Sequence, residues 1–200
     1  MIEIRQPQIQ REKAVQAMQT FLETLGLDLK VLQMEKTPNR VTDAFINFFS
    51  GLWKNPDDEW AQPIQTEVDG LVAIRNIRFQ SMCEHHLLPF FGTVHIAYYP
   101  HKGKVAGFGH FVSAVETLTK RPQLQERLTQ ELSLSLCRGL QPEGVLVVVE
   151  ATHLCMTMMH GLAGDTNIIT TATAGIIQSG SDMYHQAWNL LMEGTSDDGR

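Results

Sequence analysis

The sequence predicts an α+β protein, and two kinds of periodicity in it lead to that class. Apolar residues three and four positions apart, the spacing of one helix face, predict helices at residues 7–25, 37–49, 110–120, 122–140 and 182–192. Alternating, β-branched and aromatic stretches predict strands at residues 70–79, 93–99, 145–155 and 167–177. No internal repeat or low-complexity linker divides the chain.

The N-terminal part of the chain is expected to be helical. Val15, Met18 and Leu22 share one face of the first helix, and Thr37-Pro38 is typical of the start of the second. The stretch that follows, up to Thr66, mixes Gly, Asn, Pro and Asp and predicts a loop. The predicted parts are a helical N-terminal segment, a main domain and a frayed tail, at residues 1–66, 67–193 and 194–200.

Two of the predicted strands flank a segment rich in metal-binding side chains. Ser81-Met82-Cys83-Glu84-His85-His86 follows the strand at 70–79 and precedes the strand at 93–99, so we expect it to connect them. Leucine recurs at every fourth position from Leu124 to Leu140, which predicts a helix with one apolar face. In the strand at 145–155, a period of two puts His153 and Cys155 on the same face.

The composition restricts the class of protein. A chain of 200 residues is long enough for one sizeable domain, and its formal net charge of −6 argues against nucleic acid or an anionic membrane as a partner. No apolar run reaches the roughly 18–20 residues of a membrane span, and the N-terminus does not resemble a signal peptide, so we expect a cytoplasmic location. The three cysteines form no disulfide framework and are expected to be thiols or metal ligands.

Three side chains predict a zinc site. Cys83 and His86 stand three residues apart, which lets a tight turn present both to one ion, and Cys155 supplies a second thiolate. This donor set suits Zn²⁺ better than Mg²⁺ or Ca²⁺. Structural zinc usually has four protein ligands and catalytic zinc three, so the count indicates catalysis. The alternative is that Cys155 is a core thiol and that the Cys83/His86 spacing is coincidental.

Further polar residues accompany these ligands. His153 would face the metal and His85 adjoins a ligand, and a neutral imidazole can take a proton from water or return one to a leaving nitrogen. Alternatively, either histidine forms a hydrogen bond to a metal ligand, or it is a core histidine whose ring nitrogens are hydrogen-bonded. Gln125 and Glu126 lie at the start of the leucine-rich helix. They can form hydrogen bonds with the edge of a heterocycle. Alternatively, they form a solvent-exposed first turn, where the charge of Glu126 interacts favourably with the helix dipole.

The order of these motifs resembles the GTP cyclohydrolase I family. The resemblance rests on Cys83-Glu84-His85-His86 followed by Leu-x-Pro-Phe, on Arg121-Pro122-Gln123-x-Gln125-Glu126-Arg127-Leu128-Thr129, and on Val149-Glu150-Ala151-Thr152-His153-x-Cys155-Met156. Thr37-Pro38-x-Arg40 also fits, and the similarity runs from about residue 10 to 192.

The resemblance implies a tunnelling fold: a small antiparallel sheet with helices on one side, assembled into a toroidal homodecamer with sites between subunits. The family reaction adds water to C8 of GTP, opens the imidazole ring, releases formate and rearranges the ribose to give dihydroneopterin triphosphate. The resemblance implies that Cys83, His86 and Cys155 bind zinc and that His85 and His153 transfer protons. It also implies that Gln125 and Glu126 recognise the purine.

The chain departs from the family pattern where the family binds the triphosphate. Where the family typically has Gly-Leu-Ser-Lys-x-x-Arg, this chain has Gly107-Phe108-Gly109-His110-Phe111-Val112-Ser113. Where the family has Cys-Met-x-x-Arg-Gly, this chain has Cys155-Met156-Thr157-Met158-Met159-His160-Gly161. Charge-assisted hydrogen bonds to phosphate contribute about 1.5–3 kcal/mol each, so the loss of three fixed cations is expected to weaken GTP binding. His110 and His160 are expected to compensate only in part, and mainly when they are protonated.

The favoured prediction from the sequence is therefore zinc-dependent opening of the imidazole ring of a purine without the triphosphate, such as urate, 8-oxoguanine or a nucleoside. Phe108 and Met159 would make the former phosphate end more apolar, with His110 as a further contact. Two alternatives stay open: a genuine GTP cyclohydrolase I with phosphate contacts from elsewhere, for instance Arg40 or Arg75, and a non-catalytic purine-binding paralogue. The expected partners are a small-molecule purine and further copies of the chain.

Overall fold

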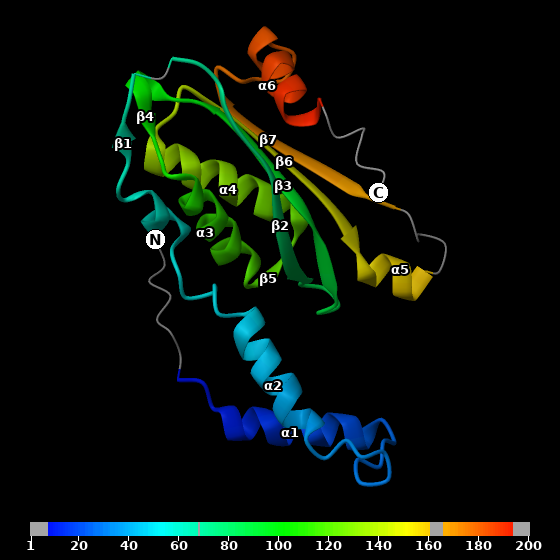
Figure 1. Cartoon of the computed structure of the whole chain (residues 1–200). Coiled ribbons are helices and arrows are strands. Elements are labelled where there is room, and N and C mark those ends of the chain that lie inside the picture. The colour runs from blue at the N-terminus through cyan, green and yellow to red at the C-terminus, as the bar shows by residue number, and fades with distance from the viewer. Residues whose placement is uncertain (1–7, 68, 161–165, 194–200) are drawn as a thin grey trace.

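The computed structural model describes residues 8–67, 69–160 and 166–193, and it has the mixed α+β architecture that the sequence predicts (Figure 1). The helices are α1 (Arg11–Thr24), α2 (Thr37–Phe48), α3 (Phe108–Thr119), α4 (Gln125–Leu140), α5 (Leu154–His160) and α6 (Asp182–Met192), with short 3₁₀ helices η1 (Pro56–Trp60) and η2 (His101–Gly103). The strands are β1 (Ile64–Gln65), β2 (Val72–Cys83), β3 (Pro89–Tyr99), β4 (Lys104–Val105), β5 (Pro122–Gln123), β6 (Gly144–His153) and β7 (Ile168–Gly175). Within the described ranges, none of the helices has the length and apolarity needed to cross a membrane.

A five-stranded sheet in the order β5-β2-β3-β6-β7 forms the centre of the protein. The strands are antiparallel except for the short parallel pair between β5 and the end of β2. The predicted connection around Cys83 to His86 is the turn between β2 and β3. Phe90 at the start of β3 pairs with His153 at the end of β6, so this turn and the end of β6 lie at the same end of the sheet.

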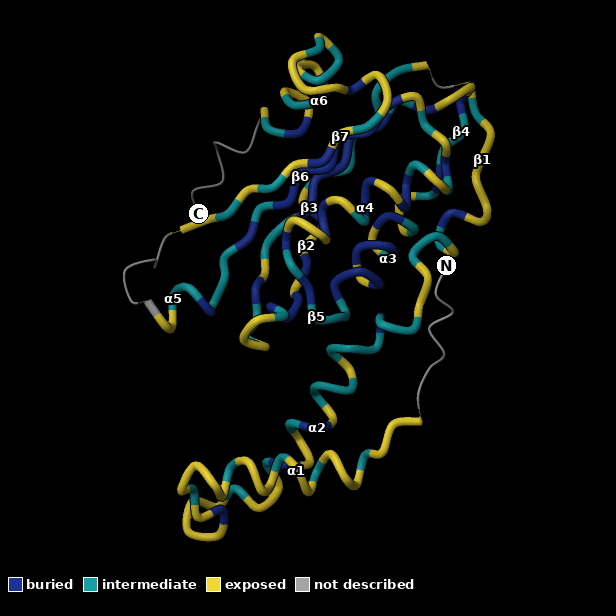
Figure 2. The backbone as a smooth tube through the Cα atoms, turned by 180° about the vertical axis from the view of Figure 1, so that it is seen from behind, coloured by how far each residue is buried: buried dark blue, intermediate teal, exposed yellow. Residues whose placement is uncertain are grey.

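Helices α3 and α4 cover one face of the sheet, and most of the core lies between them and the strands (Figures 1 and 2). The four-residue leucine repeat is the reason that α4 packs there, because Leu128, Leu132 and Leu136 all lie on its inner side and are fully buried. Helix α6 packs against the opposite face, over a second apolar cluster that includes Leu146 and Val148. The expected arrangement of helices on one side therefore holds for α3 and α4 but not for α6.

The N-terminal helices α1 and α2 extend away from the sheet, and α1 buries none of its residues (Figures 1 and 2). The segment after them belongs to the main domain. The Gly51 N–H donates to the carbonyl of Lys120 at 2.8 Å, and buried Trp60 donates from Nε1 to Ser135 Oγ at 2.8 Å. These contacts join the residues around Gly51 and Trp60 to the part of the chain that follows α3, and the predicted boundary at residue 66 stays a prediction.

His95, on β3, is a buried histidine outside the predicted site, with only 3% of its surface exposed. The Asn76 N–H donates to His95 Nδ1 at 3.4 Å, and His95 Nε2 lies 3.1 Å from Thr93 Oγ1. Because Nδ1 accepts a hydrogen bond, the neutral ring carries its proton on Nε2. Burial lowers the pKa of His95 below its usual 6.5, Arg75 lowers it further, and Glu150 opposes both effects.

We expect the neutral form of His95 to make stability depend on pH. Its pKa is lower in the folded chain than in the unfolded chain, so the unfolded chain takes up this proton first as the pH falls. The contribution of His95 is complete above the unfolded pKa, near 6.5, and is lost as the pH falls from there through the folded pKa. Urea unfolding between about pH 7 and pH 5 should show a shallower loss for His95→Gln than for the wild type; equal slopes would contradict the prediction.

Candidate metal centre

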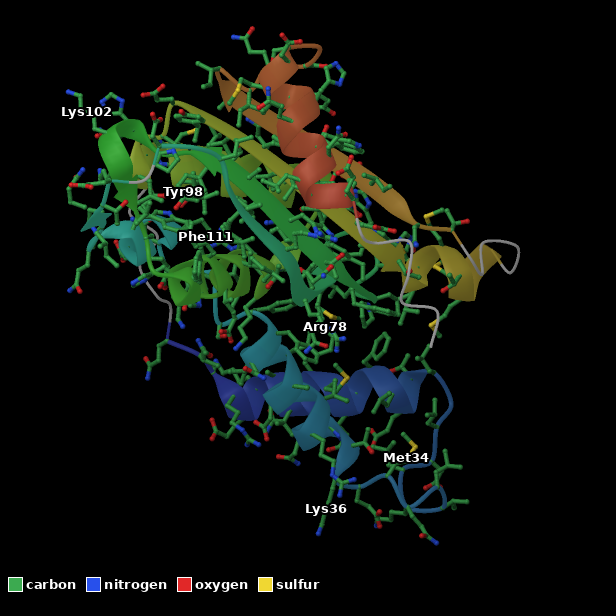
Figure 3. All side chains as sticks on the ribbon, turned by 45° about the horizontal axis from the view of Figure 1, so that its top comes forward. Met34, Lys36, Arg78, Tyr98, Lys102 and Phe111 are labelled. Carbon is green, nitrogen blue, oxygen red and sulfur yellow. The ribbon has the colours of Figure 1, made fainter. Side chains whose placement is uncertain are left out.

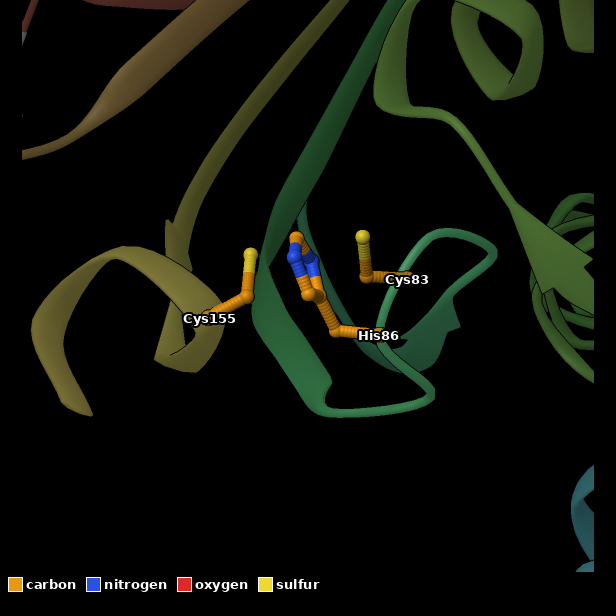
Figure 4. A group of neighbouring side chains, drawn as sticks. All are labelled: Cys83, His86 and Cys155. Carbon is orange, nitrogen blue, oxygen red and sulfur yellow. The ribbon is translucent and has the colours of Figure 1, made fainter. Parts of the chain in front are cut away.

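Three side chains from distant parts of the chain converge at one end of the sheet. Cys83 is the last residue of β2, His86 lies in the turn that follows, and Cys155 is in the first turn of α5. Their ligand atoms all lie within 4.8 Å of one another, and Figure 4 shows the side chains pointing towards a common space. Both thiols are buried, and His86 is exposed. The structure thus brings together the three predicted ligands.

The β2–β3 turn is held tightly by its own backbone. The Cys83 N–H donates to the carbonyl of Leu88 at 2.9 Å, and the Leu87 N–H donates to the carbonyl of Cys83 at 2.8 Å. Leu87 has a positive φ of 51°, which reverses the chain within this short stretch. The turn therefore presents Cys83 and His86 to the same side, as their spacing predicted.

Cys155 reaches the site by a route that differs from the sequence analysis. The predicted strand was expected to run through Cys155, with His153 and Cys155 on one face. Strand β6 instead ends at His153, and α5 begins at Leu154. Cys155 therefore does not share a strand face with His153 and enters the site from a helical turn.

The three donors fit a zinc ion. Zinc–sulfur bonds of about 2.3 Å and zinc–nitrogen bonds of about 2.0–2.1 Å would put two sulfurs and one nitrogen around a tetrahedral ion roughly 3.6–3.8 Å apart, within the 4.8 Å that bounds the ligand atoms here. Burial raises the pKa of the Cys155 thiol, and neighbouring Cys83 raises it further, so a bound cation is needed to stabilise two thiolates side by side. Three protein ligands leave one tetrahedral position open.

Phe90 and Gln125 hold the ring of His153 in one orientation. The His153 ring stacks on Phe90, with centroids 4.5 Å apart and planes at 6°, and its Nε2 lies 2.8 Å from Gln125 Oε1. Gln125 Nε2 donates to the carbonyls of Val149 at 3.0 Å and Ile168 at 2.8 Å. An amide nitrogen must face two carbonyls, so Gln125 Oε1 faces His153, which donates from Nε2 and keeps Nδ1 unprotonated in the neutral ring.

Glu126, and not Gln125, presents a polar side chain to solvent at the start of α4. Gln125 is 2% exposed and both ends of its amide are hydrogen-bonded within the chain, and its expected role in reading a purine stays a prediction. The Glu126 carboxylate is exposed. Burial lowers the pKa of His153 and Glu126 opposes this shift, which places the carboxylate near the histidine. His85 is exposed too, with its ring edge-on to His86 at 6.2 Å.

Phe108 and His110 do not lie near the metal ligands of their own chain. They begin α3, whose Phe111 stacks with Tyr98 at 5.5 Å, as Figure 3 shows at the end of the sheet opposite to α5. Tyr98 is eight residues along β3 from Phe90, a distance of about 26 Å. Their expected contact with a substrate at the metal site therefore stays a prediction.

Met159, by contrast, lies on the metal side of the molecule. It follows Cys155 on the short helix α5, and 55% of its surface is exposed. Position 159, where the family has an arginine, therefore presents a solvent-exposed methionine on this side of the molecule.

An ion pair that was not predicted from the sequence lies beside the ligands. Arg127 Nη1 lies 2.6 Å from Glu84 Oε2, and Nη2 lies 3.2 Å from Oε1. The hydrogen bond from Arg127 holds the pKa of Glu84 below its usual value and raises the pKa of Arg127. The opposite charges of the two residues were the one signal in the sequence, because nothing local shows that their motifs are adjacent.

The chain is similar to several known proteins. A family model described as GTP cyclohydrolase I matches residues 14–192. GTP cyclohydrolase 1 of Geobacillus kaustophilus (strain HTA426) is 38% identical over 185 residues, which cover 92% of this chain and 98% of that protein. GTP cyclohydrolase 1 of Streptococcus pyogenes serotype M18 (strain MGAS8232) is 41% identical over 183 residues, which cover 92% and 94%. Among solved structures, the archaeosine synthase QueF-Like in the apo form matches 54% of this chain and 96% of that chain, with a TM-score of 0.41 and 20% identity.

Proposed function

Because the chain belongs to the GTP cyclohydrolase I family, we propose that it is a zinc-dependent hydrolase that opens the imidazole ring of GTP and releases formate. The observation that carries this proposal is the convergence of Cys83, His86 and Cys155 in a protein whose relatives at 38–41% identity are named GTP cyclohydrolase 1. These relatives favour GTP over the purine without a triphosphate that the sequence analysis preferred.

The residues around the ligands have distinct roles in this proposal. When bound, a zinc ion with an open position supplies Lewis acidity, which makes water a better nucleophile at neutral pH. His153, which burial keeps neutral, accepts a proton through Nδ1 and returns it to the leaving ring nitrogen. His85 is the second proton-transfer group. Glu126 accepts hydrogen bonds from the ring N–H and amino group of guanine, leaving Gln125 to orient His153.

We further propose that the protein is a homo-oligomer with sites shared between copies, as the expected decamer would provide. Phe108 and His110 begin α3 near Tyr98, which lies about 26 Å along β3 from Phe90 at the metal end, and 66% of the Phe108 surface is exposed. Within the described part of the chain, β5 pairs only with Met82 and Cys83, so most of the outer edge of β2 is open for pairing with another copy.

A purine without a triphosphate is the second candidate substrate. The observation that favours it is that Ser113 and Met159 are uncharged where the family has Arg, and that Gly109 lacks the hydroxyl of the family's Ser. Arg75, an alternative source of a phosphate contact, already donates to the carbonyl of Glu193 at 2.8 Å. Exposed Arg40 on α2 is the better source if GTP is the substrate.

Turnover of zinc-loaded protein tests the proposal. GTP and guanosine are compared by formate release and by pterin fluorescence of the product. For 8-oxoguanine and urate, whose C8 already carries an oxygen and leaves as carbon dioxide and not as formate, turnover is followed by the loss of purine absorbance. We expect GTP to be turned over most efficiently. Faster turnover of guanosine or a free oxopurine would favour the second candidate. Tight binding of a purine without any turnover would instead identify a non-catalytic paralogue.

Met159→Arg is expected to lower KM for GTP by about 10- to 100-fold. One charge-assisted hydrogen bond to phosphate contributes about 1.5–3 kcal/mol, and every 1.4 kcal/mol corresponds to a factor of ten. Steady-state kinetics should show no such change for guanosine. Met158→Arg is the matched control, because Met158 is also exposed and the same charge is added one residue away. Equal effects of the two variants on GTP would show that position 159 does not face the phosphates.

A further inference from the structure

The turn that carries His86 is tied to the start of α4 through neighbouring residues. Cys83 pairs with Gln123 of β5, and the Glu84 N–H donates to the carbonyl of Gln123 at 3.1 Å. These backbone contacts end two residues before α4 begins at Gln125. In the described part of the chain, the ion pair between Glu84 and Arg127 joins the turn directly to the helix itself.

This ion pair has a geometry suited to positioning. Both guanidinium N–H groups of Arg127 meet both carboxylate oxygens of Glu84, at 2.6 Å and 3.2 Å, and such a planar fork fixes direction as well as distance. The Arg127 side chain is 44% exposed and that of Glu84 28% exposed. Ion pairs with this exposure contribute little to stability, so the pair has more influence on where the two segments lie than on whether the chain folds.

We propose that Glu84 and Arg127 are positioning residues whose ion pair sets the place of Glu126 relative to the metal ligands. Each partner is the immediate neighbour of a functional group: Glu84 follows Cys83, and Arg127 follows Glu126. The proposal rests on the proposed function, in which Glu126 holds the purine while the metal end of the site opens its imidazole ring. A displacement of about 1 Å between these two parts is enough to slow such a reaction about 100-fold.

A double-mutant cycle with Glu84→Gln and Arg127→Gln tests the proposal. Each single substitution is expected to lower kcat by about 10- to 100-fold, as is typical for residues that orient metal ligands. KM should change little, because Glu126 still contacts the purine. The double variant should be no slower than either single variant, since both remove the same interaction. Arg127→Lys should be intermediate because it keeps the charge without the fork.

A matched ion pair on the same helix provides the control. Arg138 binds Asp57 with the same bidentate geometry, at 2.6 Å and 2.9 Å, and the side chains are 55% and 28% exposed. Arg138 lies about 16 Å further along α4 than Arg127. Arg138→Gln and Asp57→Asn are expected to change Tm about as much as the test variants and to leave kcat unchanged.

Zinc affinity, measured by competition with a chromophoric chelator, is a readout that does not depend on turnover. Both single variants are expected to bind Zn²⁺ about tenfold more weakly. By charge alone, the loss of the Arg127 cation would tighten Zn²⁺ binding, so weaker binding by Arg127→Gln indicates position rather than charge. If the wild type opens no purine ring, the proposed function has failed. The zinc affinities of the variants, compared with that of the wild type, then test the role of the ion pair by themselves. Single variants that match the wild type, or additive losses in the double variant, would overturn the proposal.

Discussion

Cys155→Ala is expected to lose bound zinc and to lower kcat/KM by about three orders of magnitude or more. With Cys83 and His86 as the remaining ligands, the centre has two donors instead of three. Two donors bind zinc weakly, and a zinc ion contributes several kcal/mol of transition-state stabilisation, which corresponds to a rate factor of this size. Metal analysis after desalting and formate release from GTP measure the two effects together.

Cys137→Ala is the control for this prediction. Cys137 is a half-buried thiol on α4 and does not belong to the group formed by the other two cysteines. Burial raises its pKa, as expected of a thiol that packs rather than binds metal. The control variant should keep both zinc and activity. Wild-type zinc content in Cys155→Ala would show that Cys155 is a core thiol, the alternative that the sequence left open.

His153→Gln is expected to lower kcat by about 10²- to 10⁴-fold while zinc stays bound. The glutamine amide can still donate to Gln125 Oε1, so the contact that orients this position is preserved. It cannot accept and return a proton, and general acid–base catalysis contributes a factor of this size. Rapid single-turnover kinetics with GTP, together with metal analysis, separates this loss from a loss of the metal.

His101→Gln is a suitable control for the histidine substitution. His101 is exposed on η2 and lies 3.3 Å from Glu143, at the far end of β3 from the metal ligands. Its replacement should leave kcat at the wild-type value. A loss of less than about tenfold in His153→Gln would show that His153 orients other groups and does not transfer a proton in the rate-limiting step.

The elements of the fold were predictable where a local pattern repeats. The four-residue leucine spacing predicted α4, and the run from Val145 predicted β6, because side-chain burial in one element depends on residues close in sequence. The ends of the strands were not predictable in this way. Strand β3 begins at Pro89, four residues before the prediction, because Phe90 and Phe91 pair with the end of β6.

In the candidate site, too, the local chemistry was predictable from the sequence and the contacts between distant residues were not. Cysteine and histidine are few and chemically distinctive, so the sequence by itself determined which three side chains offer a zinc site and which family the chain resembles. Only the tertiary structure decided that Gln125 orients His153, that Glu84 meets Arg127, and that Phe108 lies far from the ligands of its own chain. The physical reason is that residue type and spacing encode local chemistry, whereas strand register and helix packing determine which distant side chains are neighbours.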